Sequence, residues 1–331
     1  MPSFLERLQD PSPLLYDGGF GSQLFARGIE LTNSTLANES HPDAVVDIHR
    51  AYIAAGADII GTNTFVASEL HLDMAGKDPL AAGELVRQAT AHARRAVDEA
   101  GGATFVAGSV GPSPGAIESD AGSTDFGIAD AKVRQAHERV IEGLAEGGAD
   151  LLVLETMFSA NEAAMACDIA RRTGLPIVIN LTLKYTKDRK SGEVVYKTDW
   201  GHSLADLLDI LAAGRFSDGD DLLPHVQLFG LNCGAETRRT EHTGMPYAIN
   251  GVRQLQKALE DRGLARKAMV YPNAGMPQLN SAQRTVYTQT PADMAAHIPQ
   301  LLDEGAYIVG GCCGTTPDHI AEIRRAVDAR P

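Results

Sequence analysis

Short apolar runs recur along the chain at intervals of roughly 40 residues. Each run has the length of a buried strand and is rich in β-branched or other aliphatic residues, as strands of parallel sheets are. The predicted strands are 14–16, 58–61, 104–107, 151–154, 176–179, 226–230, 268–271 and 307–309.

Stretches of helical length and helical periodicity separate these strands. Between residues 129 and 147, for example, Val133, Ala136, Val140 and Leu144 fall on one helical face. The other predicted helices are 43–55, 80–100, 161–172, 203–213, 249–261, 291–303 and 317–329. Eight alternations of strand and helix predict an α/β fold, a (β/α)8 TIM barrel.

The length of 331 residues admits either two domains or one large barrel. No low-complexity segment divides the sequence, so we expect a single domain over residues 1–331. Four long irregular stretches, 111–127, 184–201, 234–248 and 275–290, follow predicted strands and not helices. In a barrel these stretches form the loops of the catalytic face.

The net charge is −14, which argues against nucleic-acid or anionic-membrane partners because both attract basic surfaces. The amino-terminal segment lacks the basic and apolar regions of a signal peptide, and no run of about 18 uncharged apolar residues occurs. We therefore expect a cytoplasmic protein. Its oligomeric state is left open.

Three of the four cysteines lie at strand ends. Cys233 ends the sixth predicted strand, and Cys312 and Cys313 follow the eighth. In a closed barrel only the seventh strand lies between the sixth and the eighth, so the three sulfurs can converge at one rim. Three thiolates with one open position are typical of a catalytic zinc site, whose fourth ligand is water or substrate.

Other interpretations of the cysteines remain. Free cysteine is often a small buried hydrophobe, and Cys167, inside the helix 161–172, fits that description. A disulfide between the adjacent Cys312 and Cys313 would be strained. The chain could also be a barrel lyase or aldolase in which the cysteines are incidental.

One sequence pattern, a glycine and an alanine followed by an apolar run, occurs three times where a predicted helix leads into a predicted strand. It places Asn63, Glu155 and Cys312 at equivalent strand ends. Asp17 closes the first predicted strand, in Leu15-Tyr-Asp-Gly-Gly. Two carboxylates on an apolar rim could hold an ammonium group, and the glycine backbones at 18–19 and 108–111 can approach a carboxylate closely. Together they predict recognition of an amino-acid head group, unless the carboxylates only cap helices or face solvent.

Seven segments, spread in order over the whole chain, resemble the homocysteine S-methyltransferase family. They are Asp17-Gly-Gly, Thr62-Asn-Thr-Phe65, Val106-Ala-Gly-Ser-Val-Gly-Pro112, Leu154-Glu-Thr156, Gly230-Leu-Asn-Cys233, Tyr271-Pro-Asn-Ala-Gly275 and Gly310-Gly-Cys-Cys-Gly-Thr-Thr-Pro317.

The resemblance implies a barrel enzyme that uses Zn(2+) to methylate L-homocysteine to L-methionine. By position it implies Cys233, Cys312 and Cys313 as zinc ligands, with Asn273 as a displaceable fourth ligand. The substrate-binding residues that it implies are Asp17, Gly18, Gly19, Asn63, Ser109, Glu155 and Thr156.

The methyl donor is less determined, since members of the family use betaine, sulfonium compounds such as S-methylmethionine, or a methylated corrinoid protein. Betaine-using relatives carry tyrosines where this chain has Val66 and Thr156, and the motifs are most similar to the homocysteine-binding module of cobalamin-dependent methionine synthase. Tyr185, Tyr196 and Trp200 could supply aromatic faces for an onium donor, or their loop could be a solvated excursion. The alternative function is a noncatalytic homocysteine- and zinc-binding subunit of a multi-protein corrinoid system.

Overall fold

All eight predicted strands form in the structure, a computed structural model that describes residues 2–234, 239–281 and 285–330. The barrel strands are β1 (Leu14–Leu15), β2 (Ile59–Gly61), β3 (Phe105–Val110), β4 (Leu151–Met157), β5 (Ile177–Leu181), β8 (Val226–Cys233), β9 (Lys267–Pro272) and β12 (Ala306–Val309). Five of them, β3, β4, β5, β8 and β9, extend beyond the predicted carboxyl ends, whereas β1 and β2 are each one residue shorter than predicted.

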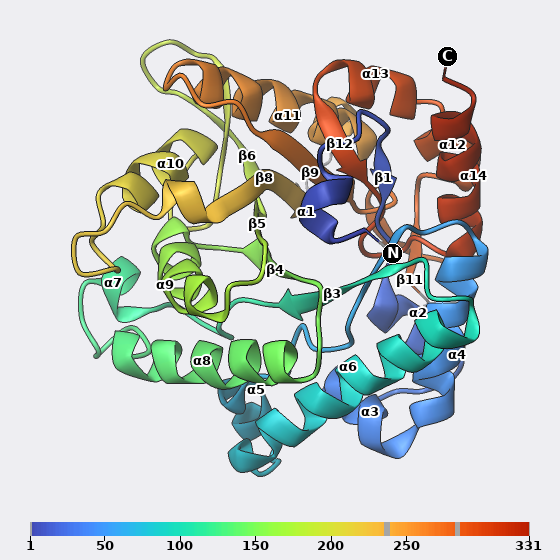
Figure 1. The fold of residues 1–331 in the computed structure, drawn as a ribbon. Coiled ribbons are helices and arrows are strands. Elements are labelled where there is room, and N and C mark those ends of the chain that lie inside the picture. Colours follow the sequence, from blue (N-terminus) through green and yellow to red (C-terminus); the bar gives the residue numbers. More distant parts are fainter. Residues whose placement is uncertain (1, 235–238, 282–284, 331) are drawn as a thin grey trace.

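The eight strands are parallel and follow the order β1-β12-β9-β8-β5-β4-β3-β2. A single bridge between Tyr16 and Ile59 joins β1 and β2, the two ends of this order. The sheet therefore curves into a ring with helices around it (Figure 1). The predicted (β/α)8 TIM barrel is confirmed.

Each predicted helix also forms, with one difference. The segment 291–303 contains two helices because Pro299 lacks an N–H and its ring would clash with the carbonyl of residue 295 in a continuous helix. The helices of the outer layer are α4 (Pro42–Ala54), α6 (Ala82–Glu99), α8 (Asp130–Glu146), α9 (Ala160–Ala170), α10 (Leu204–Ala212), α11 (Met245–Glu260), α12 (Pro291–Ala295), α13 (Ile298–Asp303) and α14 (Pro317–Asp328).

The prediction of irregular loops after the strands is wrong for two of the four stretches. Antiparallel hairpins occupy much of 184–201 and 275–290. Short helices also lie outside the predicted set. These elements are β6 (Lys184–Lys187) with β7 (Val194–Lys197), β10 (Pro277–Leu279) with β11 (Thr285–Tyr287), α1 (Phe4–Arg7), α2 (Phe20–Ala26), α3 (Ala37–Ser40), α5 (Glu69–Met74) and α7 (Glu118–Ala121).

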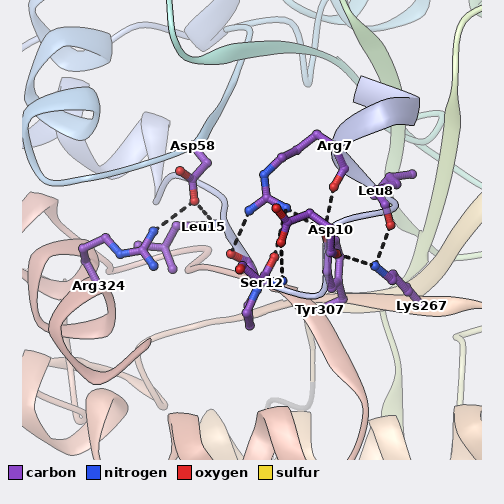
Figure 2. Close-up of polar contacts among 10 residues, drawn as sticks. Arg7, Leu8, Asp10, Ser12, Leu15, Asp58, Lys267, Tyr307 and Arg324 are labelled. Atoms are coloured by element: carbon purple, nitrogen blue, oxygen red, sulfur yellow. Dashed lines mark hydrogen bonds and ion pairs between the residues drawn. The ribbon is translucent and has the colours of Figure 1, made fainter. Parts of the chain in front are cut away.

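The amino-terminal helix α1 plugs one end of the barrel. Phe4 and Leu8 pack among inward-facing strand residues, and the Phe4 ring lies 5.5 Å from that of Phe105 in an edge-to-face arrangement. Figure 2 shows the polar contacts beside this plug: the Tyr307 hydroxyl accepts from Arg7 at 2.9 Å, and the Lys267 ammonium donates to the carbonyl of Leu8 at 2.6 Å. The plug fills the end of the barrel opposite the carboxyl ends of the strands.

Among the described residues, no helix is long and apolar enough to cross a membrane.

Candidate metal and substrate site

A cavity of about 500 Å³ opens at the carboxyl ends of the barrel strands. All eight strands, or the loops that directly follow them, contribute to its wall. Binding sites of (β/α)8 barrels lie at this end because the loops there vary without disturbing the barrel. The cavity therefore defines where the predicted site residues must converge.

Cys233, Cys312 and Cys313 do converge there. Their three sulfur atoms all lie within 4.8 Å of one another. Cys233 ends β8 with φ of 54°, a left-handed conformation uncommon for a residue other than glycine. Hydrogen bonds from Cys233 and Cys312 hold the pKa of the Cys313 thiol well below its ordinary value, whereas hydrogen bonding to Cys313 and burial raise the pKa of the Cys233 and Cys312 thiols. The cluster therefore favours at least one thiolate.

The donor chemistry of this cluster fits a metal. Zinc bound tetrahedrally at Zn–S distances of about 2.3 Å requires its sulfur ligands to lie about 3.8 Å apart. The three sulfurs meet that spacing with small adjustments, whereas Cys167 is fully buried in α9, where burial raises the pKa of its thiol to about 12. Cys167 is a core residue.

Asn273 and Tyr287 surround the cysteine cluster. Asn273 accepts a hydrogen bond from the backbone N–H of Cys313 at 3.0 Å, and its side chain also hydrogen-bonds the Cys233 sulfur. Tyr287, from β11, hydrogen-bonds the Cys313 sulfur. Asn273 is thus an outer partner of the cysteines here, and its role as a fourth ligand stays a prediction.

Asp17 and Glu155 lie in the wall of the same cavity. Asp17 is 3% exposed and accepts from the backbone N–H of Gly61 at 2.9 Å. Glu155 accepts from the Tyr271 hydroxyl at 2.9 Å and from the Ser109 hydroxyl. Burial raises the pKa of both carboxyls, and the charge of Glu155 raises that of Asp17 further. Such a pair gains from a cation, so an ammonium group would be stabilised between them.

Gly18 and Gly19 border the cavity where the chain passes close to the last barrel loop. A Cβ on Gly19 would lie 2.7 Å from the carbonyl oxygen of Cys312, and one on Gly18 would lie 2.8 Å from the Thr315 hydroxyl. The Gly19 N–H donates to that Thr315 hydroxyl at 3.0 Å. The glycines therefore bring β1 against the cysteine loop.

The other residues expected to bind substrate also line the cavity, but their polar groups are largely engaged within the protein. Asn63 donates to the carbonyl of Ser34 at 2.9 Å. The Ser109 N–H donates to the Thr62 hydroxyl at 3.1 Å, so this N–H is already paired and is not free to donate to a substrate carboxylate. Thr156, with φ of 57°, is the residue next to Glu155 and helps to fix its position.

The three aromatic residues of 184–201 separate into two groups. The Tyr196 ring is buried, lies 5.1 Å from that of Tyr247, and has its hydroxyl 2.7 Å from His242. Tyr185 stacks near the same histidine, at 4.6 Å. Trp200 is 41% exposed and lines a second cavity beside the first.

Two residues of the site were not singled out from the sequence. Tyr271 holds Glu155, and Asn232 donates to the Thr156 hydroxyl at 2.8 Å and lies 3.9 Å from the Cys312 sulfur. Tyr271 stands two residues before Asn273, and Asn232 stands directly before Cys233. Side chains alternate between the two faces of a strand. That alternation is the signal that could have placed Tyr271 on the inner face with Asn273.

Comparison with known proteins gives a consistent result. A family described as Homocysteine S-methyltransferase matches residues 14–327. The methionine synthases of Mycobacterium leprae and Mycobacterium tuberculosis are each 31% identical to this chain over 94% of its length. The chain spans 24% of the length of each of these relatives.

Among solved structures, the metallated form of the homocysteine methyltransferase MmuM from Escherichia coli has the same fold. It is 24% identical, the match covers 97% of this chain and 98% of that one, and the TM-score is 0.70. The apo form of the same protein matches with a TM-score of 0.65. The family match over nearly the whole chain, together with the converging cysteines, establishes that the chain belongs to the homocysteine S-methyltransferase family.

Proposed function

We propose that this chain transfers a methyl group to the sulfur of L-homocysteine and releases L-methionine. The observation that carries the proposal is the convergence of Cys233, Cys312 and Cys313 at the carboxyl ends of the strands, in a cavity that also holds two carboxylates. We propose further that residues 1–331 act as one homocysteine-binding domain.

The cysteines would hold one Zn(2+) ion, with Asn273 available as a fourth ligand until substrate arrives. When bound, zinc supplies Lewis-acid chemistry that favours the thiolate of a coordinated thiol, whose pKa is otherwise about 8.5. The cysteine cluster supports this ion because its donor set matches the soft ligands that zinc prefers.

The remaining residues would bind and orient homocysteine. Asp17 and Glu155 are suited to its ammonium group, and Tyr271 keeps Glu155 in position. Methyl transfer to sulfur requires no proton transfer at the methyl carbon. The protein therefore has to place the sulfur, align the donor and exclude water, and it needs no general base at that carbon.

A second candidate is a noncatalytic subunit that works only with a methylated corrinoid protein. It is favoured by one observation, that the chain covers 24% of the methionine synthases it resembles. Partners would then include the corrinoid protein, whereas the first candidate needs only homocysteine and a small donor.

The test is zinc analysis followed by a donor panel. Purified protein is assayed for zinc content and for methionine formation from homocysteine with betaine, S-methylmethionine, dimethylsulfoniopropionate, S-adenosylmethionine or methylcobalamin. One zinc per chain and methionine from a free donor support the first candidate. Activity only after addition of a methylcorrinoid protein supports the second, and protein without zinc or activity contradicts both.

A further inference from the structure

The floor of the proposed homocysteine site contains an unpaired tyrosine hydroxyl. Tyr16 directly follows β1, lines the cavity and is only 3% exposed. Its ring lies 4.8 Å from that of Tyr271, the residue that holds Glu155. The Tyr16 hydroxyl has no hydrogen-bond partner among the described residues. Because buried hydroxyls are nearly always paired, this one is available to a ligand of the cavity.

The hydroxyl of Tyr16 points toward β2 and lies near Asp17. A Cβ on Gly61 would overlap the Tyr16 hydroxyl and would lie 3.8 Å from Oδ1 of Asp17. The missing side chain at Gly61 therefore leaves room for both groups at one place in the cavity wall. Oδ2 of Asp17 accepts from the Gly61 N–H at 2.9 Å, so Oδ1 is the carboxylate oxygen on the side of the hydroxyl.

This hydroxyl is a donor at neutral pH. A tyrosine ordinarily loses its proton near pH ~10, and burial, followed by the charges of Glu155 and Asp17, raises the pKa of Tyr16 well above that value. Two carboxyl groups and one protonated hydroxyl are therefore neighbours. An amino acid carries its ammonium and its carboxylate on the same carbon, so the carboxyl groups suit the first and the hydroxyl suits the second.

Other donors in the cavity wall are already engaged. The backbone N–H groups of Gly19 and Ser109 donate to threonine hydroxyls at 3.0 and 3.1 Å. Lys184 is the one cation in the described part of the wall, and it pairs with Asp199 at 2.6 Å on an exposed rim. A carboxylate that enters together with an ammonium group thus finds its best-placed donor in the unpaired hydroxyl of Tyr16.

We infer that the Tyr16 hydroxyl donates a hydrogen bond to the α-carboxylate of the substrate and makes the cavity selective for an amino acid over the corresponding amine. This inference rests on the proposed function and gives it a specificity-determining residue. A hydrogen bond to a charged group is strong where water is excluded. A thiol without the carboxylate leaves the buried hydroxyl unpaired and forgoes that contribution.

A pair of ligands that differ only in the carboxylate provides the test. L-Homocysteine and 3-aminopropane-1-thiol share the thiol, the ammonium group and the chain of three carbons between them. Each is titrated by calorimetry against the zinc-loaded protein and against zinc-loaded Tyr16→Phe. We expect Tyr16→Phe to bind homocysteine about tenfold more weakly, or weaker still, and to bind 3-aminopropane-1-thiol within about twofold of the unmodified protein.

Further variants separate recognition from folding. Tyr16→Phe should keep its urea midpoint, because the hydroxyl that it removes has no partner. Tyr307→Phe removes a hydroxyl at the plugged end of the barrel and should bind both ligands as the unmodified protein does. Gly61→Ala brings a Cβ onto the Tyr16 hydroxyl, whereas the nearest ring carbon would be 3.2 Å away. Tyr16→Phe should therefore restore part of the stability that Gly61→Ala loses.

Equal homocysteine affinity in the unmodified protein and in Tyr16→Phe would overturn the inference. An equal loss for both ligands would overturn it too, since it would indicate a structural role, and so would a loss of selectivity in Lys184→Gln but not in Tyr16→Phe. In all three cases homocysteine still binds and the proposed function stands. If the unmodified zinc-loaded protein neither binds homocysteine nor forms methionine, the proposed function fails and the inference fails with it.

Discussion

The side-chain amide of Asn232 holds both the backbone N–H and the hydroxyl of Thr156, each at 2.8 Å. This contact joins the carboxyl ends of β4 and β8 beside two non-glycine residues with positive φ, Thr156 and Cys233. Such conformations persist where surrounding contacts over-determine them. The contact therefore positions Glu155, which precedes Thr156, and Cys233, which follows Asn232, relative to each other.

Removal of this contact should affect stability and metal binding together. Asn232→Ala leaves the buried Thr156 N–H without its partner, so we expect a loss of about 2 kcal/mol in the free energy of unfolding. Zinc affinity should fall about 10-fold or more, since Asn232 also approaches the Cys312 sulfur. Urea unfolding and zinc competition measure the two effects. Gln135→Ala, at an exposed position of α8, is the control and should change neither.

The cysteine cluster gives a sharper metal prediction. Cys312→Ala should abolish stoichiometric zinc, with a loss of affinity beyond the roughly 10- to 100-fold cost of removing an outer partner. Cys167→Ala should retain one zinc per chain, because Cys167 lies in the core of α9. Elemental analysis of the dialysed proteins decides the matter. Full zinc content in Cys312→Ala would contradict the assignment of the ligands.

The carboxylates predict an effect on homocysteine binding. Glu155→Gln removes a charge but keeps the shape and the contact to Tyr271, so we expect the Kd of homocysteine to rise about 10- to 100-fold. Calorimetry with zinc-loaded protein measures it. Glu193→Gln, on the exposed β6–β7 hairpin, should bind homocysteine as the unmodified protein does. An unchanged Kd in Glu155→Gln would exclude this carboxylate from the binding site.

A buried histidine predicts how stability depends on pH. His49 lies against Phe20, neither of its ring nitrogens has a partner among the described residues, and burial lowers its pKa to about 3. The unfolded chain binds a proton at His49 below about pH 6.5, whereas the folded chain does so only near pH 3, so acid favours unfolding between these values.

Protonation of His49 in the unfolded chain should therefore lower the free energy of unfolding by about 2 kcal/mol between pH 7 and pH 5. Urea unfolding at the two pH values measures the loss. His49→Leu should remove that share of the pH dependence, whereas His225→Leu, at an exposed position, should retain it. Equal pH dependence in both variants would show that His49 is not the group responsible.

The amino-terminal plug predicts a contrast between adjacent residues. Phe4 is 2% exposed and contacts Phe105, while Leu5 is 47% exposed. Phe4→Ala should lower the free energy of unfolding by about 3 to 4 kcal/mol, and Leu5→Ala should change it by less than about 0.5 kcal/mol. Similar unfolding midpoints for the two variants would contradict the packing of the plug.

The barrel could be predicted from sequence because its strands are continuous apolar runs and its helices have one apolar face. The hairpins could not. The segments 184–187 and 194–197 contain several lysines and are only partly buried, so their hydrophobic signal is weak. Tyr196 of β7 packs against Tyr247 of α11, about 50 residues further along the chain, and no local pattern indicates that contact.

The cysteine site was predictable for a topological reason. Strands that end in cysteine on either side of β9 must bring their sulfurs to one rim once the barrel closes. The engagement of the Ser109 N–H by Thr62, and of Asn273 by Cys313, depends on side-chain rotamers that a sequence does not specify. These contacts decide which groups remain available to a substrate, and only the three-dimensional arrangement supplies them.

The plug formed by Phe4 and Leu8 determines which end of the barrel is open to ligands. Because side chains fill the end near the amino termini of the strands, a ligand of the cavity enters and leaves through the loop-lined mouth at the other end. In the reaction proposed above, homocysteine, the methyl donor and both products would therefore share a single entrance.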